Sequence, residues 1–127
     1  MVEAIADAVA KRPLLAFELE LGEVGYFGHG RAARVVWIGL RTGANAMAAL
    51  AAQVEDECVR AGLPAEARSH QAHLTLARAR PRGGARLPEL PATPRLEEWP
   101  ADRLVLYASR LARTGAVYEA MRTLRLA

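Results

Sequence analysis

The residues of this chain best suited to chemistry are His73 and Thr75, which are separated by one residue. Histidine, with a usual pKa of about 6.5, can take up or release a proton at neutral pH, and a threonine hydroxyl can donate a hydrogen bond to a phosphoryl oxygen. On a β-strand, residues two apart point to the same side and lie about 6–7 Å apart. The pair is therefore suited to one phosphate group, although this spacing is also typical of a solvated strand face.

Alternation of apolar and polar residues predicts the strand that positions this pair. Over residues 72–80, Leu74 and Leu76 fall on one side, and His73 and Thr75 fall on the other. Three more features belong to the same sheet pattern. They are an alternating strand at 14–21, a loop marked by the glycines from 22 to 30, and a more central strand at 34–40 that is apolar on both sides.

Helical patterns and a final pair of strands complete the expected elements. Residues 2–11 and 44–61 have helical spacing, and the second helix should end at Gly62. Two strands, at about 102–111 and 116–126, flank a predicted turn at Thr114-Gly115. The order predicts an α+β fold, with a mostly antiparallel sheet and helices packed on one face. A length of 127 residues fits one domain, residues 1–127.

Composition excludes several classes of protein. The chain has no apolar run of the roughly 18 residues that span a membrane, so we expect a soluble, cytoplasmic protein. A single cysteine, Cys58, lies on the apolar side of the second helix and is expected to be buried filler. The three histidines lack zinc-ligand spacing, so no metal or cofactor is expected.

Charge is divided unevenly along the chain. Residues 1–66 carry nine acidic and six basic side chains, whereas residues 67–127 carry five acidic and eleven basic ones. Four arginines fall within nine positions, and guanidinium groups match phosphate oxygens in geometry. This density suits a phosphate-bearing partner, although sixteen arginines against one lysine is also what a biased genomic base composition produces. The four are Arg78, Arg80, Arg82 and Arg86.

Three segments together resemble one protein family. The segment from Ser69 to Arg78, with His73-Leu74-Thr75-Leu76-Ala77-Arg78 at its end, resembles the second H-x-T motif of the RNA 2′,3′-cyclic phosphodiesterases, or 2′-5′ RNA ligases, of the 2H phosphoesterase superfamily. Residues 34–40, with Trp37, resemble the family's tryptophan-bearing strand. Residues 104–111, followed by Gly115 and Tyr118, resemble its ending. The resemblance runs from about Leu14 to the end of the chain.

This resemblance implies a two-lobed phosphoesterase fold and hydrolysis of RNA 2′,3′-cyclic phosphate ends to 2′-phosphomonoesters without a metal. His73 would transfer a proton, with general base as the better assignment, and Thr75 would bind a phosphoryl oxygen. Arg78, which matches an arginine of the family five residues after the histidine, would neutralise the phosphate. Arg80, from the dense run of arginines and not from the resemblance, is expected to help bind phosphate or RNA. Strict alternation places Arg78 on the side away from His73, so its role requires the strand to bend or end near Ala77.

The family pairs two H-x-T/S motifs across one cleft, and this sequence contains one. Relative to the family's pattern, Met1 falls inside a helix of the first lobe, so part of that lobe is expected to be missing. One interpretation is a homodimer in which each chain contributes His73 to a shared cleft. A second is a catalytically incomplete module that binds RNA ends or nucleotides. A third is a folded remnant without a ligand.

The aromatic residues are assigned more conservatively. Trp37 is expected in the core, because its neighbours are apolar, and Tyr107 and Tyr118 are expected to be structural. Trp99, between Glu98 and Pro100, is expected to be partly exposed, where it is able to stack on a base.

Overall fold

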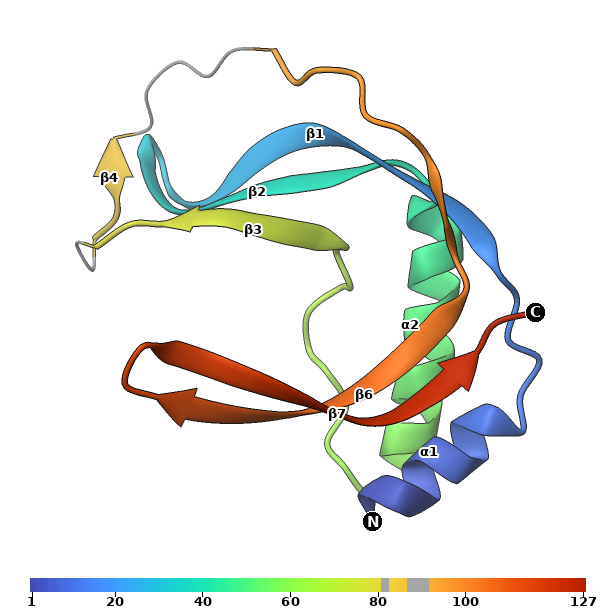
Figure 1. Cartoon of the computed structure of the whole chain (residues 1–127). Helices are drawn as coiled ribbons and strands as arrows, with labels where there is room; N and C mark the ends of the chain where they lie inside the picture. The colour runs from blue at the N-terminus through green and yellow to red at the C-terminus, as the bar shows by residue number, and fades with distance from the viewer. Residues whose placement is uncertain (81–82, 87–91) are drawn as a thin grey trace. The chain divides into compact units, whose positions relative to one another are not determined.

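The fold is taken from a computed structural model, which describes residues 1–80, 83–86 and 92–127 (Figure 1). The chain forms two compact units that are interleaved along the sequence. One unit contains Met1–Phe17, Ala49–Ser69 and Pro100–Ala127; the other contains Glu18–Ala48 and His70–Trp99. We call them unit 1 and unit 2. The expected α+β class and antiparallel strand pairing are confirmed.

Unit 2 is built on a curled antiparallel sheet. Its strands are β1 (Phe17–His29), which belongs to unit 2 from Glu18 onward, β2 (Ala32–Thr42), β3 (His73–Arg78) and the short β4 (Ala85–Arg86). Of the short β5 (Trp99–Ala101), only Trp99 belongs to unit 2. The order is β3-β2-β1-β5, with β4 also paired to β2. Strand β2 is therefore central, as predicted, and β3 lies at an edge of the sheet (Figure 1).

The predicted glycine loop between residues 22 and 30 is wrong, because β1 continues through this segment to His29. Most of these glycines allow a side chain or backbone group of β2 to lie close to the β1 backbone, and they do not form a turn. A Cβ atom on Gly25 would lie 2.5 Å from the ring of Trp37, and one on Gly28 would lie 2.0 Å from the carbonyl oxygen of Ala32. Of the glycines in this segment, only Gly30 has a positive φ, +57°, in the turn that joins β1 to β2.

Unit 1 contains α1 (Val2–Ala10), most of α2 (Ala44–Arg60), β6 (Arg103–Ala112) and β7 (Gly115–Arg125). Both helices and the β6–β7 hairpin lie close to the predicted positions, and Gly62 ends α2 with a φ of +102°. The core consists of side chains from α1, the segment between α1 and β1, α2 and the C-terminal segment: Val9, Leu14, Leu50 and Leu126. No helix in the described part of the chain is long and apolar enough to cross a membrane.

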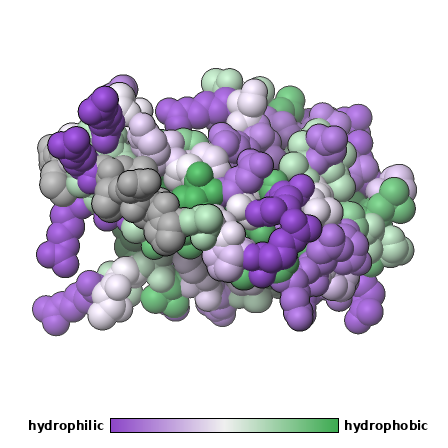
Figure 2. Space-filling model, turned by 90° about the horizontal axis from the view of Figure 1, so that it is seen from above, coloured by the Kyte–Doolittle hydropathy of each residue, from purple (hydrophilic) through white to green (hydrophobic). Residues whose placement is uncertain are grey.

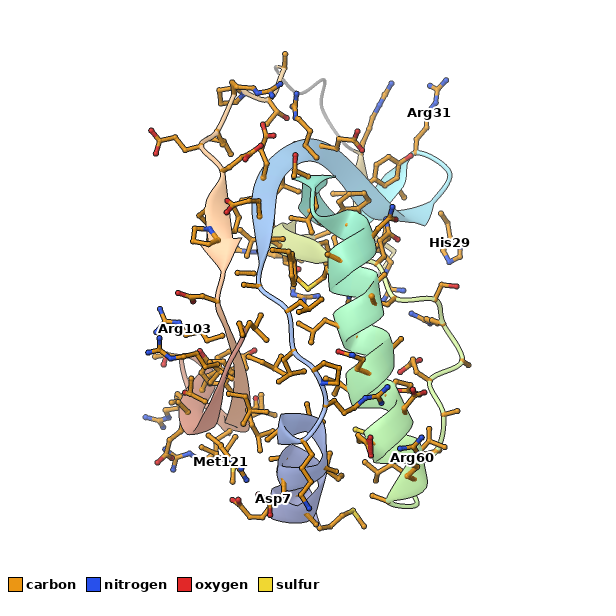
Figure 3. The ribbon with its side chains drawn as sticks, turned by 90° about the vertical axis from the view of Figure 1, so that its right-hand side faces the viewer. Asp7, His29, Arg31, Arg60, Arg103 and Met121 are labelled. Atoms are coloured by element: carbon orange, nitrogen blue, oxygen red, sulfur yellow. The ribbon has the colours of Figure 1, made fainter. Side chains whose placement is uncertain are left out.

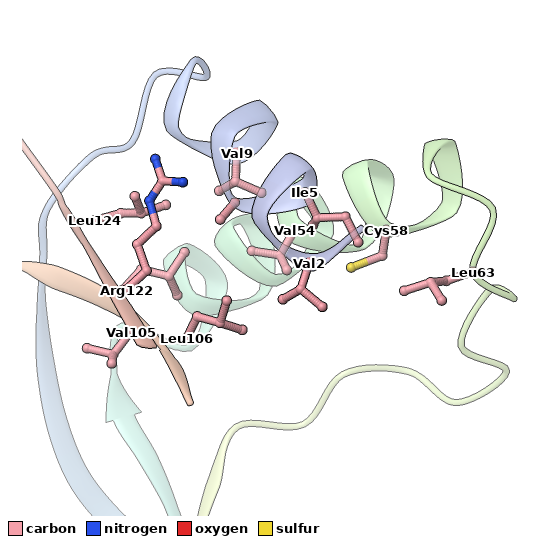
Figure 4. Close-up of a pocket in the computed structure, with 12 residues that line it drawn as sticks. Val2, Ile5, Val9, Val54, Cys58, Leu63, Val105, Leu106, Arg122 and Leu124 are labelled. Carbon is pink, nitrogen blue, oxygen red and sulfur yellow. The ribbon is translucent and has the colours of Figure 1, made fainter. Parts of the chain in front are cut away.

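An apolar cavity of about 270 Å³ lies beside this core (Figure 4). Cys58 lines it together with Val54 and Leu63, so the cysteine is partly buried among apolar side chains, close to the prediction. Arg122 also lines the cavity, and its guanidinium forms ion pairs with Asp7 and Glu3 of α1.

Tyr107 and Tyr118, which are expected to be structural, lie at the surface of the hairpin. They are 54% and 65% exposed and contact each other edge to face, with ring centroids 6.3 Å apart. Pairing places Tyr118 opposite Ser109, on the side of the hairpin that does not carry Leu104 and Leu124 into the core. Trp99 is 41% exposed, as predicted.

Candidate active site on the β3 edge

His73 is the first residue of β3, and its ring orientation is fixed by the chain just before it. The Nδ1 atom lies 2.7 Å from the carbonyl oxygen of Gln71. A carbonyl oxygen only accepts hydrogen bonds, so Nδ1 must carry a proton and donate it. In the neutral ring this leaves Nε2 as the free proton acceptor. The side chain is exposed, so solvent reaches it.

Two aromatic rings pack against the imidazole. Phe27 of β1 meets it edge to face, with ring centroids 5.3 Å apart, and Trp37 of β2 lies 6.3 Å away. The same two rings lie 5.4 Å from each other. Pairing of Gly39 with His73 and of Gly25 with Trp37 explains this arrangement, because both glycines leave room on this side of the sheet. The three rings therefore form one cluster on the His73 side.

Trp37 thus differs from the expected core residue. It is only partly buried, and it belongs to the same side of the sheet as the candidate base. Its Nε1 atom is enclosed and has no hydrogen-bond partner among the described residues. The indole lies over Gly25 and Gly39, and it fits there because neither residue has a side chain.

A β-bulge brings Arg78 to the side of Thr75. Trp37 pairs with Thr75 and Val36 pairs with Ala77, so one step along β2 matches two steps along β3, and Leu76 is the extra residue. Val35 then pairs with Arg78. Directly opposed residues share a side of the sheet, and Val35 and Trp37 are two apart on β2. Arg78 therefore shares a side with Thr75 and His73, and the bend that its role requires is present.

Strand pairing does not place Arg80 beside His73, Thr75 and Arg78. It lies two residues beyond the end of β3 and is exposed. The β3 end is held to β2 by the backbone amide of Ala79, which donates to the carbonyl of Arg34 over 2.9 Å. Near this end, His29 and Arg31 project outward from the β1–β2 turn (Figure 3).

Sequence reasoning missed Phe27 and the Gln71 carbonyl, the two groups that orient the imidazole. Gly25 precedes Phe27 by two residues and Gly39 follows Trp37 by two, but the space that both glycines leave is occupied by the ring of Trp37. This pattern therefore indicates Trp37 and not the contact between Phe27 and His73. Glycine two residues from a large aromatic side chain on an apolar strand indicates a ring that lies across the backbone of the sheet. The role of the Gln71 carbonyl has no signal in the sequence either, because every residue carries a carbonyl.

Comparison with solved structures supports the fold. An E. coli LigT structure complexed with 3′-AMP is 23% identical, with a TM-score of 0.81, and the match covers 98% of this chain and 68% of LigT. A structure described as a phosphoesterase gives the same values. The Thermus thermophilus protein TT0787 is 24% identical, with a TM-score of 0.76, and the match covers 98% of this chain and 67% of that one. No curated protein sequence matches the chain.

A family model gives the broader assignment. The model of the 2′-5′ RNA ligase superfamily matches residues 1–113, which include His73, Thr75, the bulge at Leu76 and Arg78. Since the match covers most of the chain, the protein belongs to the 2′-5′ RNA ligase superfamily.

Proposed function

We propose that this protein hydrolyses the 2′,3′-cyclic phosphate at the end of an RNA strand to a 2′-phosphomonoester. The observation that carries the proposal is the arrangement on β3. His73 has Nδ1 committed to the Gln71 carbonyl and Nε2 free, on the same side as Thr75 and Arg78. Membership of the 2′-5′ RNA ligase superfamily supports the same class of substrate, and LigT has been solved with 3′-AMP bound.

In the proposed reaction, His73 Nε2 takes a proton from a water molecule as the water oxygen attacks phosphorus. The bond between phosphorus and the ribose O3′ breaks, and O3′ receives a proton. The Thr75 hydroxyl donates to a phosphoryl oxygen, and Arg78 balances the charge that builds up on the phosphate. Phe27 and the Gln71 carbonyl keep the imidazole in the orientation this transfer needs.

One imidazole serves one of the two proton transfers, so the leaving oxygen requires a second donor. We propose that a second copy of the chain supplies it through its own His73. The edge position of β3 supports this, because no described strand pairs with its outer side. Specific activity would then rise with protein concentration as dimers form. Activity that is independent of dilution, in a sample shown to be monomeric by sedimentation, would rule out the shared cleft.

The function is tested with a short RNA that ends in a 2′,3′-cyclic phosphate, in buffer containing EDTA. We expect turnover by the wild type and a loss of about 10²–10⁴-fold in His73→Ala, the range for a positioned acid or base. Thr75→Val should lower kcat, because it removes a donor while keeping the shape of the side chain. His70→Ala is the matched control, since His70 precedes β3 and is exposed.

A folded wild-type protein without turnover would contradict the proposed catalysis. Binding of RNA that ends in a 2′-phosphate would then be measured on the same sample. Binding that is lost in Thr75→Val would identify a module that recognises RNA ends without hydrolysing them.

A further inference from the structure

Five exposed arginines gather at one end of the unit 2 sheet, and we call this group the arginine end. They come from the β1–β2 turn, from β2, from β3 and its exit, and from β4: Arg31, Arg34, Arg78, Arg80 and Arg86. Pairing explains why they meet, since β4 places Arg86 opposite Ala32 and β3 places Arg78 opposite Val35. Hydrophilic side chains extend from the left-hand end of Figure 2, the end at which Figure 1 draws β4 and the β1–β2 turn.

The surface of the arginine end contains two adjoining hollows. One, of about 170 Å³, is lined by Arg34, Arg78 and Arg86 together with small side chains. The other, of about 360 Å³, is lined by Arg31, Ala32 and Arg86. Because Arg86 borders both, the two hollows form a continuous basic surface.

The arginine end has no acidic counterpart in the described residues. No carboxylate of residues 1–80, 83–86 and 92–127 lies within ion-pair distance of these five guanidinium groups, whereas Arg41 and Arg95 of the same unit both pair with Glu20. Clustered cations repel one another in the free protein, and a partner that carries several anionic groups relieves this repulsion. Phosphate is well matched, because guanidinium N–H groups bind its oxygens in pairs.

Arg78 links this surface to the candidate active site. It lies on the side of Thr75 through the bulge, and it also lines the hollow that contains Arg34 and Arg86. A phosphate bound at Thr75 is therefore followed along the sheet by further cationic positions. In an RNA strand the next phosphates belong to the same molecule, so once the end is bound their local concentration is high.

We infer that the arginine end binds the phosphodiester backbone of the RNA chain that precedes the reacting phosphate. The protein then selects RNA chains over single nucleotides. The inference rests on the proposed function, since that function places the RNA end at Thr75. The contacts are to backbone phosphates, so the selection is for chain length and not for base sequence.

The test compares the affinity of the full chain for a 2′-phosphorylated mononucleotide with its affinity for an RNA of about six nucleotides that has the same end. We expect the longer ligand to bind at least tenfold more tightly at low salt. Arg34→Ala and Arg86→Ala should each remove a large part of that preference. Each substitution should also lower the slope of log affinity against log salt by about 0.7, the value for one phosphate contact on a single strand.

Arg113→Ala is the matched control, because Arg113 is an exposed arginine at the β6–β7 turn, in unit 1, with no ion pair among the described residues. The substitution removes the same charge and leaves all five arginines of the arginine end in place. The inference is overturned if both ligands bind the wild type equally, or if Arg113→Ala weakens binding of the longer RNA as much as Arg86→Ala does.

Failure of the proposed function has a different signature. It would show as no hydrolysis of either a nucleoside 2′,3′-cyclic phosphate or a longer cyclic-phosphate RNA, while the preference for the longer ligand remains. Hydrolysis of both substrates with equal kcat/KM, and no length preference in binding, would retain the function and reject the arginine end as its RNA-binding surface.

Discussion

Arginines occupy two contrasting kinds of region in this protein. Around Glu20 in unit 2 and Glu57 in unit 1, they surround a buried carboxylate: Arg41 and Arg95 pair with Glu20, and Arg12 and Arg60 pair with Glu57. At the arginine end, the described residues place no carboxylate within reach. Arginines beside the buried Glu20 and Glu57 therefore stabilise the fold, whereas those of the arginine end, with no carboxylate nearby in the described residues, are available to a ligand.

Glu20 shows how complete the first arrangement is. Its side chain is 3% exposed, and its Oε1 accepts a hydrogen bond from the Thr42 hydroxyl over 3.1 Å. Arg95 Nε lies 2.9 Å from Oε2, as a close ion pair rather than an aligned hydrogen bond. A charge this deeply buried is tolerated only with such partners.

The largest effect on stability is expected for Glu20→Ala. It leaves the Thr42 hydroxyl and two guanidinium groups without their shared acceptor and opens space in the sheet, so the free energy of unfolding should fall by about 2 kcal/mol. Urea denaturation measures this loss. Glu98→Ala, which removes an exposed carboxylate of the same unit, is the control; an equal loss in both would remove any special role of the buried acid.

A smaller loss is expected for Arg12→Ala. This side chain is 27% exposed, and its guanidinium donates to the Gln53 carbonyl and to two carboxylates of α2. The free energy of unfolding should fall by about 1 kcal/mol. Arg60→Ala should change it by less than about 0.5 kcal/mol, because Arg60 is 72% exposed and solvent screens its pair with Glu57. Equal losses of unfolding free energy in Arg12→Ala and Arg60→Ala would show that the exposure of the arginine does not determine how much its ion pair stabilises the fold.

The smallest effect on stability is expected at the arginine end itself. Arg86→Ala should shift the free energy of unfolding by less than about 0.5 kcal/mol, as for an ordinary surface position. Thermal or urea unfolding of the same sample used for RNA binding provides the measurement. A loss comparable to that of Arg12→Ala would place Arg86 among the structural arginines and remove the contrast between the two regions.

The parts of the fold that depend on local pattern could be predicted from the sequence. Helix α2 with its Gly62 stop and the β6–β7 hairpin both follow from spacing and turn residues within one segment. The long β1 strand could not, because glycine disfavours strands unless another part of the chain uses the space. Here Trp37, on a different strand, lies over Gly25, and that contact outweighs the local preference.

The candidate site divides in the same way. His73 and Thr75 could be placed on the same side from the sequence, because they are two residues apart on one strand. The side of Arg78 depends on how β3 is paired with β2, and a single sequence contains no record of that register. The contact between Phe27 and His73 joins residues far apart in the chain, so it too emerges only on folding.

Because Leu76 is an extra residue in β3, the residues after it lie on the opposite side of the sheet from the one that simple alternation predicts. One extra residue in a strand moves every later side chain to the other side of the sheet. Here the bulge is confined to Leu76, and β3 stays paired with β2 on both sides of it. Because of this bulge, Arg78 shares a side with Thr75, three residues away, and with His73, five residues away. Counting alternate residues along the strand would have assigned Arg78 to the opposite side. When residues of a bulged edge strand are assigned to the two sides of the sheet, the counting has to start again after the bulge.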